Sequence, residues 1–174
     1  MTRHSGSLLH PLLHAGHLVE ARLRDRLKQV GLRPRQARVL SALSRMGEIH
    51  QKTLASEFDI TAASMSSMCD RLMAAGFIDR SVDPNERRAF LIRLTPEGES
   101  KVRDIRLAWG DIDALLVEAM GQKEAAELAE LSSELRDQLG GCIPGINLKE
   151  TSDCLLYTSP SPRDQRGSRM PSSA

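Results

Sequence analysis

The stretch LASEFDITAASMSSMCDRLMAAGFIDRSVDPNERRAFLIRLTPEG, residues 54–98, decides the fold. It contains a helix with two marked ends, because Thr61 is a good N-cap and Gly76 a good stop. The apolar side chains between them recur at the i, i+3, i+4, i+7 spacing of one buried helix face: Met65, Met68, Cys69 and Leu72. We therefore predict an amphipathic helix over residues 62–75, preceded by a short helix over 51–58 and a turn.

Residues 77–94 have the pattern of a β-hairpin. The run AFLIRL alternates between two sets of side chains with the period of a half-buried strand: Phe90, Ile92 and Leu94 against Ala89, Leu91 and Arg93. The run FIDRSV, residues 77–82, supplies the partner strand. Between the runs, Asp83-Pro84-Asn85-Glu86 favours a tight turn, because Asp bonds its own backbone and Pro fixes φ.

Further helices are predicted on both sides of this stretch, where apolar residues recur at helical spacing. They cover residues 11–30, 34–46, 99–118 and 122–139. In the last one, four leucines are expected to point inward: Leu128, Leu131, Leu135 and Leu139. The order of elements predicts a mainly α fold with a small β-hairpin wing, which is a winged helix-turn-helix with additional helices at both ends.

The composition is that of an ordinary globular protein. Of 174 residues, 40% are hydrophobic and 27% are charged, which fits one domain with its own core. No apolar run is long enough to span a membrane, and no signal-peptide pattern occurs at the N-terminus. Three cysteines make no disulfide framework, so we expect a protein of the reducing cytoplasm.

The last residues differ in composition from the rest. Residues 154–174 are rich in serine and proline and have no helical or strand period, which indicates disorder. They resemble translated sequencing-adapter or cloning sequence, the alternative being a natural disordered tail. We expect 151–174 to be a disordered, non-native tail and 1–150 to form one domain. Residues 1–150 hold 21 basic and 21 acidic side chains, so any affinity for nucleic acid depends on how charge is arranged locally.

The face of helix 62–75 opposite its apolar stripe is small and hydroxylated. The side chains expected at a nucleic-acid surface are Thr61, Ala63, Ser64, Ser66, Ser67 and Arg71, with Asp70 on the same face. Small hydroxyl residues allow close approach to a major groove and hydrogen-bond phosphates or base edges. The alternative is a solvated, serine-rich surface. The basic hairpin beside the helix favours DNA.

Two adjacent arginines, Arg87 and Arg88, lie near the tip of this hairpin. Neighbours on a strand point to opposite faces, so only one of the two is well aimed at DNA. We expect Arg88 to be the main DNA contact or wing brace and Arg87 to be secondary. The other arginine is expected to pair with Asp83 or Glu86 and so to stiffen the turn.

Residues 54–98 resemble the central signature of the MarR family of transcriptional regulators. The matching residues are Leu54-Ala55, Asp70-Arg71-Leu72, Gly76, Asp83-Pro84, Arg88 and Leu94-Thr95-Pro96-Glu97-Gly98. The flanking helices extend the resemblance over about residues 8–140. Two positions depart from the family pattern. Glu86 stands where Asp is usual, and Arg33-Pro34 replaces the usual Leu-Thr at the start of the second helix.

The resemblance implies a homodimer that binds a pseudo-palindromic operator in double-stranded DNA, and a repressor released by a small-molecule ligand or an oxidant. Residues 34–98 would then bind DNA, while 11–30 and 99–140 would form the dimer. The apolar stripes of these outer helices exceed what one small winged helix covers, which also indicates a partner. The family's effector cleft implies a small aromatic or other effector near His14, His17, Met46 and Trp109. No cofactor or metal is expected.

Alternatives remain open. A winged helix that binds proteins instead of DNA would have the same elements. A metal-sensing regulator is another, because His10, His14 and His17 fall at i, i+4 and i+7. Cys69 is expected to be an inert buried thiol and Cys142 an exposed one. An enzyme is not indicated, since no Gly-rich phosphate loop, Gly-x-Ser-x-Gly elbow or His-Glu-x-x-His motif occurs.

Overall fold

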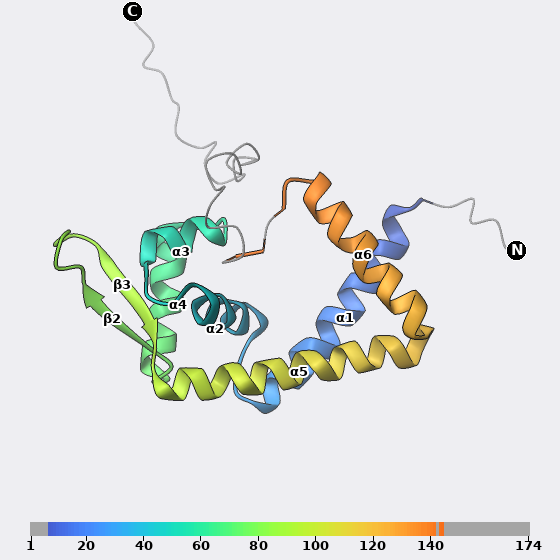
Figure 1. The fold of residues 1–174 in the computed structure, drawn as a ribbon, viewed down its shortest axis with the longest axis horizontal. Coiled ribbons are helices and arrows are strands. Elements are labelled where there is room, and N and C mark those ends of the chain that lie inside the picture. The colour runs from blue at the N-terminus through green and yellow to red at the C-terminus, as the bar shows by residue number, and fades with distance from the viewer. Residues whose placement is uncertain (1–6, 142, 145–174) are drawn as a thin grey trace, which may run out of the picture.

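Capping signals set the ends of most helices in the computed structural model, which describes residues 7–141 and 143–144. The elements are α1 (Leu9–Gln29), α2 (Pro34–Met46), β1 (Ile49–His50), α3 (Gln51–Glu57), α4 (Ala62–Ala74), β2 (Ile78–Val82), β3 (Phe90–Leu94), α5 (Pro96–Met120) and α6 (Gln122–Gln138) (Figure 1). This mainly helical chain with a small antiparallel sheet confirms the predicted fold class. The expectations for Cys142 and for the 151–174 tail lie outside the described residues.

Three elements differ from the prediction. α5 runs from Pro96 to Met120 and so extends beyond the predicted range of 99–118 at both ends. α1 begins at Leu9 and not at Pro11, because a proline in the first turn lacks only an amide that has no partner within the helix. The strand β1 was not predicted at all. It pairs with β3 through Ile49 opposite Ile92 and His50 opposite Leu91, and two residues are too few to show a strand period.

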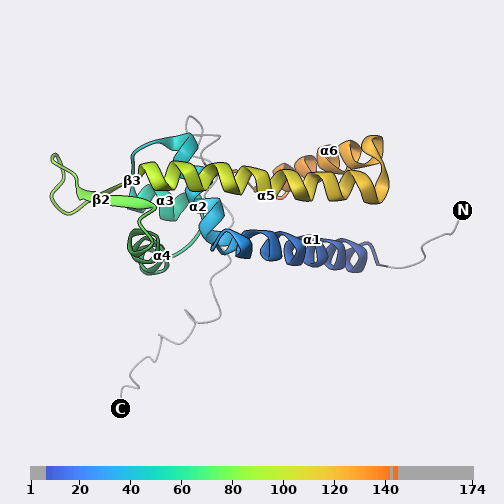
Figure 2. The same ribbon diagram turned by 90° about the horizontal axis from the view of Figure 1, so that it is seen from below.

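The elements divide between a lobe at one end and long helices at the other. In Figure 1, α2, α3, α4 and the sheet gather at one end, and α5 runs from this lobe to α6 at the far end. Figure 2 shows α1 lying along α5. The strand order is β1-β3-β2, and β2 and β3 project beyond the lobe as the wing (Figure 1).

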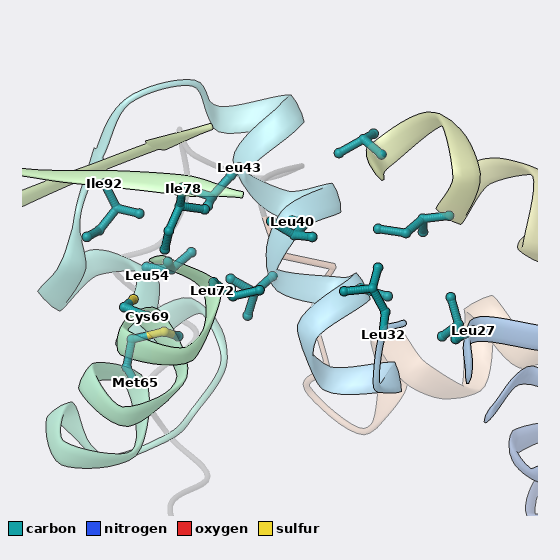
Figure 3. Close-up of a cluster of buried hydrophobic side chains, with 14 of the residues drawn as sticks. Leu27, Leu32, Leu40, Leu43, Leu54, Met65, Cys69, Leu72, Ile78 and Ile92 are labelled. Atoms are coloured by element: carbon teal, nitrogen blue, oxygen red, sulfur yellow. The ribbon is translucent and has the colours of Figure 1, made fainter. Parts of the chain in front are cut away.

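Aliphatic side chains hold the lobe together. Figure 3 shows the buried cluster, whose largest members are Leu27, Leu40, Leu43, Leu54, Met65, Leu72, Ile92 and Ile105. The predicted inward stripe of α4 is confirmed, since Met65, Cys69 and Leu72 are fully buried and Met68 is half-buried. Burial of this stripe turns the opposite face of α4 outward.

The junction between the wing and α5 depends on Thr95 and Gly98. The Thr95 hydroxyl donates to the carbonyl oxygen of Gly76 at 2.6 Å and accepts from the amide of Gly98 at 3.0 Å. A Cβ at Gly98 would collide with the backbone carbonyl oxygen of Phe77, so a side chain there would push α5 away from the end of α4. One threonine and one glycine thus fix α5 against the helix that precedes the wing.

The outer helices leave a large apolar surface uncovered. α6 buries no residue in the single chain, and the four leucines expected to point inward are exposed by 41 to 71%: Leu128, Leu131, Leu135 and Leu139. That expectation was wrong for one chain, because α6 packs mainly on α5. α1 adds Leu9, Leu12, Leu13 and Leu18, each more than half exposed. Several exposed leucines on one helix are typical of a surface that a protein partner covers. Among the described helices, none is both long and apolar enough to cross a membrane.

Candidate nucleic-acid interface

The outward face of α4 carries the predicted hydroxyl residues. Thr61 caps the helix, because its Oγ1 accepts from the amide of Ser64 at 3.2 Å and donates to the Ser64 hydroxyl at 2.9 Å. Of the side chains predicted for this face, Ser66 is half-buried and the others are exposed: Thr61, Ala63, Ser64, Ser67 and Arg71. The helix has 13 residues, which corresponds to about 20 Å and is long enough to lie in a major groove.

The inward face of α4 contains the thiol of Cys69. Burial raises the pKa of this thiol to about 11, with Arg80 opposing the shift and Asp70 adding to it. The thiol is therefore protonated near neutral pH, and the thiolate is the form that oxidants attack. This is the environment expected of an inert buried cysteine.

Arg80 on β2 joins the wing to α4. Its Nη1 lies 3.1 Å from Oδ1 of Asp70, and its guanidinium lies over the ring of Phe90, 5.0 Å from the centroid. The Arg80 side chain is only 26% exposed, so it packs against β3 while it holds a carboxylate of α4. Asp70 faces the candidate interface, and this pairing reduces its repulsion of a phosphate.

The tip of the wing presents two unpaired cations. Arg87 and Arg88 are exposed in the loop between β2 and β3, and neither forms an ion pair within 4.0 Å among the residues described. The carboxylate of Asp83 binds His50 at 3.0 Å and not an arginine. Glu86 contributes a backbone carbonyl, which accepts from the amide of Ala89 at 2.8 Å. Both guanidinium groups are therefore available to an anion.

An open cavity of about 810 Å³ lies on the other side of α4. Its charged and hydroxyl lining comes from α1, from the start of α2 and from α4: Glu20, Arg24, Arg33, Arg35, Ser64, Ser67 and Arg71. Four arginines face one acid, Glu20, whose carboxylate lies 3.8 Å from Arg24. Positive charge thus adjoins the serine face on the side away from the wing.

Sequence reasoning missed the contribution of Arg24, Arg33 and Arg35. A local signal existed, because α2 begins among arginines and has no acidic residue in its first turn. Cations at a helix N-terminus oppose the helix dipole, which indicates a partner outside the helix. The backbone amide of Arg33 at the start of α2 nevertheless has a hydrogen-bond partner, since Oε1 of Gln36 accepts from it at 2.9 Å. Replacing the usual Leu-Thr by Arg33-Pro34 therefore adds charge without losing this bond.

The residues predicted to bind a ligand do not line this cavity. His14 and His17 are exposed on α1, while Met46 and Trp109 are half-buried against the core. Their part in ligand binding stays a prediction. His10 is also exposed and lies inside α1. Within the described residues, no group of three or more His, Cys, Asp and Glu side chains is arranged to hold a metal ion.

Comparison with known proteins gives one consistent family. Residues 30–89 match the profile described as MarR family. The HTH-type transcriptional repressor MdtR of Bacillus subtilis is 22% identical over 67% of this chain and 76% of its own length. The HTH-type transcriptional regulator FarR of Neisseria gonorrhoeae is 26% identical over 71% of this chain and 85% of its own.

Solved structures agree with this result. The reduced form of MarR from E. coli has a TM-score of 0.67 at 23% identity, covering 75% of this chain and 97% of that one. The transcriptional regulator PA4135 has a TM-score of 0.64 at 29% identity, covering 76% of this chain and 97% of that one. At 23% identity, the similarity to MarR from E. coli shows a shared fold and no more.

Proposed function

We propose that this chain is a MarR-type winged-helix transcriptional regulator that binds a pseudo-palindromic operator in DNA as a homodimer. Each chain would place α4 in the major groove of one half-site and its wing beside it. The observation that carries this proposal is the hydroxylated face of α4 with exposed arginines on both sides, in the cavity and at the wing tip.

The α4 face would supply sequence recognition. Ser64 and Ser67 are exposed, and each hydroxyl both donates and accepts, so they suit base edges. Ala63 has no polar group and suits a thymine methyl. Arg71, Arg24 and Arg35 extend from the cavity side, where phosphate contacts would set the position of the helix.

The wing would contact the neighbouring part of the duplex. Arg87 and Arg88 are exposed and without ion-pair partners among the described residues, so binding an anion breaks no existing pair. Arginines in such a ribbon bind phosphates or enter a narrow minor groove. The wing would therefore add affinity and a preference for particular flanking sequences.

The outer helices would form the dimer. The exposed leucines of α6 and α1 lie on helices that pack against α5, at the end of the molecule far from the wing (Figure 1). In a symmetric dimer, the same apolar face of each copy is buried against the other copy. Dimerisation at this end leaves both recognition helices free.

Regulation by a small molecule fits the same framework. The Bacillus relative is named a repressor. We infer that this chain also represses, and that an aromatic or other small-molecule ligand releases it by binding near Met46, Trp109, His14 and His17. The raised pKa of Cys69 disfavours this thiol as an oxidant sensor. A ligand is therefore favoured over oxidation of Cys69 as the releasing signal.

Selection of duplexes from a random pool with the full chain tests the proposal. We expect enrichment of inverted half-sites spaced by about one helical turn, 10 base pairs from centre to centre. Ser67→Ala should change the preferred bases, and Arg71→Ala should weaken binding to all duplexes. A folded dimer that enriches no sequence would contradict the proposal and favour the protein-binding winged helix.

A further inference from the structure

The base of the wing contains a buried carboxylate with two separate partners. Asp83 is 7% exposed and is the one charged residue that is buried in the part of the chain described. Its Oδ1 accepts from the amide of Asn85 at 2.7 Å, and its Oδ2 lies 3.0 Å from Nε2 of His50. A buried carboxylate is unfavourable unless such bonds compensate it. The first bond is local to the turn, whereas the second reaches outside the wing.

The register explains how His50 reaches Asp83. His50 lies opposite Leu91 on β3, and Leu91 lies opposite Ser81 on β2. Two residues further along each strand, the amide of Asp83 donates to the carbonyl oxygen of Ala89 at 3.0 Å. Residues two apart on a strand share a face, so Asp83 and Ala89 lie on the same face as His50.

We propose that His50 is a positioning residue for DNA binding, which anchors the base of the wing to the lobe through Asp83 and so aims Arg87 and Arg88. This inference rests on the proposed contact between the wing and DNA. His50 comes from β1, between α2 and α3, and its side chain makes no capping bond to α3. The imidazole therefore serves the wing and not the helix that follows it.

The wing needs such an anchor because it projects beyond the lobe. A two-stranded ribbon on its own is marginally stable. Arg80 attaches β2 to α4 through Asp70, and His50 supplies a second attachment from β1. Without the second attachment, the wing samples more orientations. The apparent affinity for DNA then falls in proportion to the fraction of molecules whose wing has the orientation that binds DNA.

Replacing His50 tests this role with little disturbance of the core, since its side chain is 40% exposed. The probe is the duplex enriched by the wild-type chain. His50→Ala should weaken binding about tenfold, the size expected for losing a hydrogen bond to a charged group. His50→Gln should restore most of it, because the Gln amide nitrogen lies as many bonds from Cβ as Nε2 does. Asp104→Asn breaks the Lys101–Asp104 pair of α5, 3.0 Å long, and should bind like wild type.

Two further readouts separate positioning from mere stability. Hydrogen exchange at the amides of Asn85 and Ala89 should be faster in His50→Ala than in wild type and should return to the wild-type rate in His50→Gln. The melting temperatures of both variants should equal that of wild type. Asp83→Asn keeps an oxygen for the Asn85 amide but loses the acceptor for His50. The double variant of His50→Ala and Asp83→Asn should have the same DNA affinity as whichever single variant binds more weakly. Additive losses would show that the two residues act independently and would overturn the proposal.

The proposed contact of the wing with DNA and the proposed role of His50 can be tested separately. If a variant with both Arg87→Ala and Arg88→Ala binds as wild type does, the proposed wing contact fails. If that variant binds weakly while His50→Ala binds normally, the anchor fails. Unchanged amide exchange at Asn85 and Ala89 in His50→Ala overturns the anchor whatever the DNA result.

Discussion

Replacing Arg88 by alanine should make operator binding less sensitive to salt. The side chain is exposed at the wing tip and has no ion-pair partner within 4.0 Å among the described residues, so its removal takes away a free cation and almost no packing. A homodimer loses one such cation from each wing. If each one neutralises a phosphate, the slope of log K against log salt becomes shallower by about 1.8, at 0.9 per phosphate.

This slope translates into a measurable change of affinity. Between 50 and 200 mM salt, a slope difference of about 1.8 alters the ratio of wild-type to variant affinity about twelvefold. The loss should therefore be largest at low salt and should shrink as salt rises. If Arg88 enters a narrow minor groove, the loss is also greater on duplexes with A·T-rich flanks.

Fluorescence anisotropy titrations at several salt concentrations measure this effect, with light scattering and a thermal melt for each variant. Arg103→Ala is the matched control, because Arg103 is an exposed arginine on α5 outside the proposed interface. A folded, dimeric Arg88→Ala protein with unchanged affinity and slope would refute the wing assignment. An equal change in Arg103→Ala would show that net charge, and not position, is responsible.

Three other predictions follow from the fold. The double change of Leu131→Asp and Leu135→Asp should dissociate or unfold the dimer, because both side chains are exposed on α6 in the single chain; a wild-type chain that is monomeric by light scattering at micromolar concentration would contradict this. Deleting residues 154–174 should leave melting temperature and operator affinity unchanged, since that segment lacks an apolar pattern, and a fall of more than a few degrees would show a structural tail. Because burial raises the pKa of Cys69 from 9.0 to about 11, its contribution to stability should be complete below pH 9 and lost as pH rises towards 11; chemical unfolding across this range should show a smaller decline in Cys69→Ala.

Elements defined by local signals could be predicted from the sequence. Thr61 caps α4 as expected, and α2 runs from Pro34 to Met46 as predicted. The hairpin was found from alternation and turn residues within one short stretch. In each case the deciding interactions join residues close together in the chain.

The rest depends on contacts between distant segments. β1 pairs with residues 41 to 43 positions away, and His50 and Asp83 are 33 positions apart. Nothing in the stretch around His50 indicates a wing partner. The cavity likewise gathers Arg24, Arg35 and Arg71 from three helices. The leucines of α6 were expected to point inward because periodicity shows which face is apolar, but it does not show whether the same chain covers that face.

The distribution of charge connects these features to function. Residues 1–150 carry no net charge, yet six exposed arginines surround α4: Arg24, Arg33, Arg35, Arg71, Arg87 and Arg88. At the opposite end of the molecule, α6 carries five acidic and two basic residues (Figure 1). Such a separation steers the basic end towards DNA and keeps the acidic end away from it. A chain with no general excess of positive charge must bind through several arginines at once, and a loose wing would withdraw two of the six. The anchor at His50 therefore matters more here than it would in a strongly basic protein.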